Sequence, residues 1–130
     1  MSVRIRLTVI NNTGADIKCT SIKCKKFLDL QVGSVVADKG KAIFLSETSD
    51  RIFCEFSQTN NPDAGKWQMG MTSPKLSDNN AYGTFMAGLQ KYKKSGSPLE
   101  LTYILGTKNK ADWDNGDKDE GNTITFGDCS

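Results

Sequence analysis

The sequence predicts an all-β fold, an antiparallel β-sandwich with at most one short helix. Apolar and polar residues alternate with the period of two that strands show, and turn-forming residues recur at roughly every ten to fifteen positions. The length of 130 residues is that of one domain with its own core. We therefore expect residues 1–130 to form a single β-sandwich domain.

The first expected strand covers residues 3–9, where apolar residues alternate with polar ones. It ends at an Asn-Asn-Thr-Gly turn, residues 11–14, because Asn and Gly tolerate the positive φ of a tight turn. A hairpin to residues 17–24 is therefore expected. Within 17–24 the apolar positions change parity, which predicts a β-bulge near Ser21.

Further strands are expected between clusters of Gly, Pro, Asn, Asp and Ser. They cover residues 27–32, 41–45, 51–56, 66–71, 99–105 and 123–126. Residues 82–89 fit a strand or part of a helix, since residues 81–94 are the one stretch with apolar residues on a helical face. Trp67 alternates with Met69 and Met71, so these side chains are expected in the core.

Composition excludes several classes of function. The 17 Lys and Arg residues against 15 Asp and Glu give a net charge of +2, so nucleic acid is not an expected partner. No stretch approaches the ~20 apolar residues of a membrane span, and the first residues lack a signal-peptide pattern. The chain is expected not to span a membrane and to be cytoplasmic or non-classically secreted. The absence of histidine removes the commonest general base, which favours a binding protein over an enzyme.

The four cysteines are Cys19, Cys24, Cys54 and Cys129. They lack C-x-x-C spacing and have no histidine beside them, so a zinc site is not expected. Two disulfides in an oxidising compartment are one interpretation. Free buried thiols are the other, because Cys19 and Cys54 alternate with apolar neighbours.

Residues 112–120 gather carboxylates just before the last expected strand. One interpretation is a hydrated acidic loop. The other is a calcium (Ca2+) site, because calcium prefers clustered oxygen ligands. The first candidate metal ligands are Asp112, Asp114, Asp117 and Asp119.

Four residues are the candidates for ligand binding. Trp113 and Asn115 lie in the acidic segment, where an exposed aromatic ring suits stacking on a sugar. Tyr92 and Lys93 belong to a basic run that suits acidic lipid headgroups or sulfated sugars, although such a run is also ordinary on a hydrated surface. The expected partners are thus glycans or membrane lipid headgroups.

The layout of the chain resembles a known group of β-sandwich proteins. An alternating first strand that ends in Asn-Asn-Thr-Gly, and the stretch from Lys91 to Gly96 leading into residues 99–103, resemble the aegerolysin and actinoporin-like group, including fungal fruit-body lectins. The resemblance implies a lectin-like or cytolysin-like protein that recognises membrane lipids or glycans, with a toxic or defensive role. Residues 101–126 are similar to the closing strands of starch-binding modules and of calcium-dependent lectins, which would place a glycan near Trp113 and Asn115.

A second hypothesis is a structural or protein-interaction domain that self-assembles into a homo-oligomer through exposed strands. A basic edge, with lysines of the kind that guard a strand against unwanted pairing, is expected along residues 18–26. Asn11-Asn12-Thr13 is also a glycosylation sequon, which matters only in a secreted protein.

Overall fold

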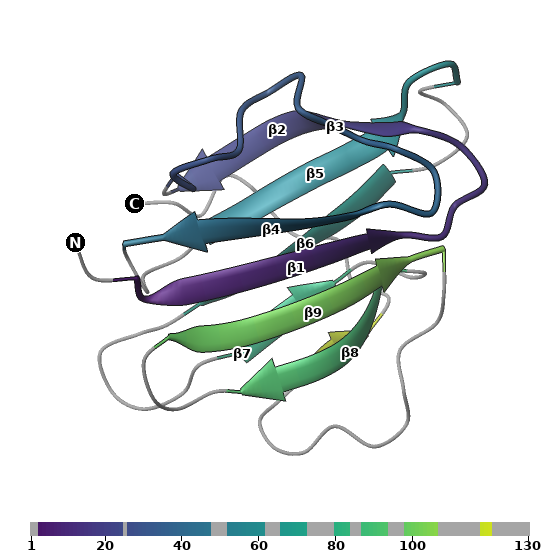
Figure 1. Ribbon diagram of the computed structural model, residues 1–130. Coiled ribbons are helices and arrows are strands. Elements are labelled where there is room, and N and C mark those ends of the chain that lie inside the picture. Colours follow the sequence, from purple (N-terminus) through teal and green to yellow (C-terminus); the bar gives the residue numbers. More distant parts are fainter. Residues whose placement is uncertain are drawn as a thin grey trace.

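Two β-sheets pack face to face in a computed structural model of the chain (Figure 1). The structure describes residues 3–24, 26–47, 52–61, 66–72, 80–83, 87–93, 98–106 and 118–120. These residues contain strands and no helix, and most neighbouring strands are antiparallel. The all-β sandwich predicted from the sequence is confirmed.

The four-stranded sheet has the order β4-β1-β9-β8. Its strands are β1 (Ile5–Asn11), β4 (Lys41–Ser46), β8 (Ala87–Lys93) and β9 (Leu99–Leu105). The first strand of the chain therefore lies inside the sheet, antiparallel to β4 and parallel to β9. Its alternation is explained by this position: Ile5, Leu7 and Val9 are fully buried, whereas Arg4 and Arg6 are exposed on the outer face.

The six-stranded sheet has the order β10-β7-β6-β5-β2-β3. Its strands are β2 (Ile17–Cys24), β3 (Val35–Val36), β5 (Ile52–Gln58), β6 (Lys66–Thr72), β7 (Asn80–Gly83) and β10 (Lys118–Glu120). The register between β2 and β5 shifts between Cys19 and Ser21. The predicted bulge is confirmed there, and it explains why the apolar positions of β2 change parity.

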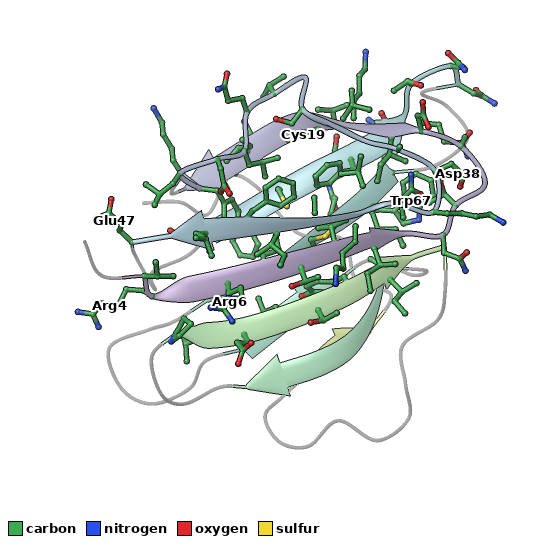
Figure 2. All side chains as sticks on the ribbon, in the orientation of Figure 1. Arg4, Arg6, Cys19, Asp38, Glu47 and Trp67 are labelled. Atoms are coloured by element: carbon green, nitrogen blue, oxygen red, sulfur yellow. The ribbon has the colours of Figure 1, made fainter. Side chains whose placement is uncertain are left out.

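The core lies between the two sheets and is filled by apolar side chains from both (Figure 2). Tyr103 and Phe56 are the largest of the fully buried side chains. Trp67 and Met69 belong to the same cluster, as their alternation predicted. The Tyr103 hydroxyl donates a hydrogen bond of 3.2 Å to the carbonyl oxygen of Gly70, which ties β9 of one sheet to β6 of the other.

The expected hairpin between residues 3–9 and 17–24 is wrong, because β1 and β2 belong to different sheets. The backbone amide of Asn11 donates to the Gly40 carbonyl at 2.9 Å, and that of Asn12 donates to the Leu105 carbonyl at 3.0 Å. The start of the turn is thus bound to the neighbours of β1 in the first sheet. The chain then crosses over to begin β2 in the second sheet.

The strand expected at residues 27–32 is also wrong, since this stretch contains bends and a turn instead. The buried residues here are Phe27 and Leu30, three positions apart, whereas a strand would bury every second residue. The stretch makes isolated hydrogen bonds, such as Leu28 N to Leu45 O at 2.7 Å, in place of a ladder.

The helix considered at residues 81–94 is contradicted by β7 and β8, which occupy residues 80–83 and 87–93. Both segments satisfy their backbone groups by pairing, β7 with β6 and β8 with β9. Tertiary pairing therefore overrides the weak helical pattern. The strand expected at residues 123–126 lies outside the described residues.

Cys19 and Cys54 are free thiols with 1% and 0% of their surface exposed, so the free-thiol interpretation holds for these two. Burial raises the pKa of both thiols. The pKa of Cys54, the more deeply buried thiol, is raised well above the ordinary value of 9.0. The Cys24 side chain and Cys129 lie outside what the structure describes.

The raised thiol pKa values predict a loss of stability at alkaline pH. In the unfolded chain the thiols ionise near pH 9.0, whereas in the folded protein they stay protonated there. The contribution of the thiols to the free energy of unfolding is therefore complete below that pH and is lost as the pH rises towards the folded pKa. The free energy of unfolding, measured by urea titration at several pH values, should fall less steeply above pH 9.0 in Cys54→Ala than in the unchanged protein. Equal slopes would contradict this prediction.

Candidate functional site

The connection between β2 and β3 closes one side of the sandwich. We call residues 26–34 the strap. The Ser46 hydroxyl of the four-stranded sheet donates to the Lys26 carbonyl at 3.1 Å. The Gly33 amide donates at 2.8 Å to the carbonyl of Cys19, which belongs to the six-stranded sheet. Phe27 and Leu30 point into the core, where the Phe27 ring lies 6.4 Å from that of Phe44. The strap is therefore anchored to both sheets and by its own apolar side chains.

The outside of this region carries exposed apolar side chains. Leu28, Val32, Val35 and Ile43 are 49%, 65%, 58% and 46% exposed, and they are all of the exposed large hydrophobic residues in the described part of the chain. Leu28 and Val32 belong to the strap, and we call these two residues the strap surface. Val35 shares the outer face of the six-stranded sheet with Lys18, whereas Ile43 shares the outer face of the four-stranded sheet with Thr8. Single exposed apolar side chains are ordinary, but two of them within one short connecting segment make that segment a candidate contact site.

Charged side chains of both signs lie in and around the strap. Residues 17–46 contain six lysines and two aspartates, and the exposed Asp16 and Glu47 lie directly outside these bounds. Lys26 and Asp29 are exposed in the strap itself, and Lys39 and Lys41 are exposed beyond β3. Lys39 is in the turn beside Asp38, at the end of the sandwich opposite Arg4 and Glu47 (Figure 2). Lys26, whose carbonyl oxygen accepts the Ser46 hydroxyl next to Glu47, is thus the lysine of the strap itself, and Lys39 lies towards the other end of the sandwich.

Local hydrogen bonds fix the path of the chain through this region. The Asp29 carboxylate accepts the Leu45 amide at 2.9 Å, which covers part of the outer edge of β4. Lys39 adopts φ +64° in the turn that follows β3, and the Asp38 amide there donates to the Asp16 carboxylate at 2.9 Å. The exposed residues therefore project from a defined backbone.

The predicted site residues are only partly placed by the structure. Trp113, Asn115, Asp112, Asp114 and Asp117 lie outside the described residues. Asp119 is in β10, where its Cα lies opposite that of Tyr82 in β7. Tyr92 and Lys93 are in β8, opposite Leu101 and Glu100 of β9. The structure describes only the backbone of these three, so it does not bring them together with one another or with the strap surface.

No three carboxylate, thiol or imidazole side chains among the described residues are grouped so as to hold a metal ion. No helix within the same ranges has the length and apolar character needed to cross a membrane.

Comparison with protein families finds no family model that matches the chain, and a search of curated proteins likewise finds no match.

Proposed function

We propose that the chain is a non-enzymatic binding protein that attaches reversibly to membrane surfaces through the strap surface and recognises anionic lipid headgroups there. The observation that carries this proposal is the pair of exposed apolar side chains, Leu28 and Val32, in a strap that begins with the exposed Lys26. Apolar side chains that enter the headgroup region, combined with lysines that attract anionic lipid, are the usual means of attachment at a membrane interface.

The expected strength is that of a reversible contact. Leu28 and Val32 each expose about half of their surface or more, and burying that part contributes about 1 kcal/mol for each side chain. Each lysine close to an anionic leaflet contributes about 1 kcal/mol more, and this part weakens with salt. The loss of freedom on binding opposes these contributions, so weak, reversible attachment, no tighter than about the millimolar range, is expected.

The resemblance to the aegerolysin and actinoporin-like group points to the same class of ligand. A glycan contact at Trp113 and Asn115, and a calcium site in the acidic segment, stay predictions about residues outside the described ranges. A vesicle assay performed both with calcium and with EDTA separates these contributions, because the strap surface needs no metal for its own contact.

Co-sedimentation with vesicles tests the proposal. The protein should bind vesicles that contain phosphatidylserine more strongly than vesicles of phosphatidylcholine alone. Leu28→Ser combined with Val32→Ser should weaken that binding by about 2 kcal/mol, roughly thirtyfold, because two apolar anchors are lost. Raising the salt concentration should weaken the binding of both proteins.

The matched control is Asn60→Ser combined with Asn61→Ser, which alters two exposed residues in the connection after β5. This variant should bind as the unchanged protein does. Equal binding by the Leu28/Val32 variant would remove the strap surface from the contact. Absence of binding to every vesicle, together with an oligomer that the same two substitutions dissociate, would favour the self-assembling domain instead.

A further inference from the structure

The outer face of the four-stranded sheet carries side chains in three successive rows. β1 and β9 lie side by side and parallel at the centre of this sheet (Figure 1), so residues paired in their register point to the same side. The residues that alternate with the buried ones point outward, and they form the pairs Arg6 with Glu100, Thr8 with Thr102 and Ile10 with Ile104. Along the strands the outer face therefore changes from charged to hydroxyl-bearing to apolar.

The apolar part of this face extends onto the edge strand β4. Ile43 lies opposite Thr8 and is 46% exposed, and Leu45, opposite Arg6, is partly exposed. Ile10 and Ile104 are partly exposed as well. The outer face of a sheet that meets water is usually polar, so these four aliphatic side chains are typical of a surface that another molecule covers.

The charged row places an arginine beside a carboxylate at the surface. Nη1 of Arg6 lies 3.5 Å from Oε1 of Glu100, and the two side chains are 46% and 22% exposed. A guanidinium group has five N–H donors, and this contact engages one of its nitrogens. Arg6 can therefore bind a second carboxylate that approaches from outside the sheet.

We propose that two copies of the chain pack together through this face, related by a twofold axis nearly parallel to β1 and β9. Rotation about such an axis places β1 of one copy on β9 of the other. Arg6 then faces Glu100 of the partner subunit, so that each arginine lies between two carboxylates in a ring of alternating charge. In the next two rows threonine meets threonine and isoleucine meets isoleucine, which are favourable contacts between sheets.

The order of the rows selects the direction of the axis. A twofold axis across the strands would place the charged row of one copy on the isoleucine row of the other, and desolvating charges against apolar side chains is costly. An axis along the strands avoids this cost and gives the aligned packing in which stacked sheets meet at about 30°. β4 and β8 form the rim of the contact, so the exposed Lys41 of β4 occupies a rim position, where charged residues are usual.

The size of the face sets the strength of the contact. Four strands about 4.8 Å apart, with seven residues of about 3.3 Å each, have a flat footprint of about 440 Å². Two copies therefore bury on the order of 1,000 Å² of accessible surface, which is at the low end for specific complexes, so the dimer is weak and depends on concentration. The contact uses neither Leu28 nor Val32, so it stands independently of the proposed function.

Sedimentation of the full chain from about 10 µM to about 1 mM tests the proposal, and the average mass should rise towards that of a dimer. Arg6→Glu and Glu100→Arg should each weaken dimerisation at least about tenfold, because the ring then holds four groups of like charge. An equimolar mixture of the two variants should associate again, since each copy then faces the opposite charge. Lys23→Glu makes the same change of charge at an exposed position of β2, in the other sheet, and should leave dimerisation unchanged.

Amide chemical shifts of the ¹⁵N-labelled chain locate the contact without any substitution. Dilution should shift residues 6–10 and 100–104 more than residues 17–24 of the other sheet. A monomer at every concentration, a dimer that Arg6→Glu leaves intact, or a mixture of the two charge variants that fails to associate would overturn the proposal. A dimer that the Leu28/Val32 double variant dissociates and Arg6→Glu does not would also overturn it and assign the contact to the strap surface.

Discussion

Replacing Asn11 with alanine is expected to lower the free energy of unfolding by about 3 kcal/mol, because several buried groups lose their partners at once. The side chain is fully buried. Its Nδ2 donates to the carbonyl oxygens of Ala15 at 2.8 Å and Val36 at 3.0 Å, and its Oδ1 accepts the Thr13 amide at 3.0 Å and the Thr13 hydroxyl at 2.7 Å. Urea unfolding followed by fluorescence measures the loss.

Asn12→Ala is the matched control, since Asn12 is the same residue type, adjacent and exposed. It should change stability by less than about 0.5 kcal/mol. A loss below about 1 kcal/mol in Asn11→Ala would show that water replaces the amide. The same hydrogen bonds bear on the sequon: both Nδ2 hydrogens are donated within the fold, so Asn11 is not accessible to glycosylation once the turn has formed.

Gly70→Ala is expected to have the largest effect of any single methyl group added to the described sheets. Gly70 lies opposite Phe53 in the β5–β6 pair and adopts φ +153°. An added Cβ would overlap the Ile52 carbonyl oxygen and lie 2.7 Å from Cδ1 of Phe53. The two strands would have to separate, and the bond from Tyr103 to the Gly70 carbonyl would be strained with them. We expect a loss of more than about 3 kcal/mol, or failure to fold.

Gly33→Ala in the strap is the control for the backbone alone. Gly33 has φ +101°, but an added Cβ would meet no atom within 4 Å. It should cost about 1 kcal/mol, the cost of a left-handed conformation for a residue with a side chain. The melting temperatures of the two variants, measured by thermal unfolding, separate the effect of steric overlap in Gly70→Ala from that of backbone strain in Gly33→Ala. Similar melting temperatures would show that β5 and β6 adjust to the methyl group.

The alternation of apolar and polar residues predicted the strands that pair regularly with their neighbours. It did not predict structure that depends on contacts between residues distant in sequence. In β1 and β9 every second residue is buried, so the pattern in the sequence and the exposure in the structure agree. The Asn-Asn-Thr-Gly turn correctly marks a change of direction. The residue types of the turn do not specify which sheet the next strand joins. Here the backbone amide of Asn12 donates to the carbonyl oxygen of Leu105, a residue distant in sequence.

The candidate site depended on the path of the strap, which the sequence does not reveal. Leu28 and Val32 have the composition of a buried strand, yet they are exposed because Phe27 and Leu30 occupy the space between the sheets. The buried polar side chains on the outer face of β5 could not be predicted from the sequence either. Glu55 and Ser57 have the spacing of ordinary outward residues, and only the register with β2 and β6 brings Thr20, Gln68 and the lysines beside them.

The central position of β1 has a consequence for synthesis of the chain on the ribosome. Arg6 and Glu100 face each other across neighbouring strands although they are 94 positions apart. β1 therefore cannot be flanked on both sides until β9, nearly the last described strand, has emerged from the ribosome. Contacts of such long sequence separation slow folding. Until then the apolar side chains of β1, Ile5, Leu7 and Val9, are not fully buried. We expect a nascent chain with these side chains exposed to bind a chaperone.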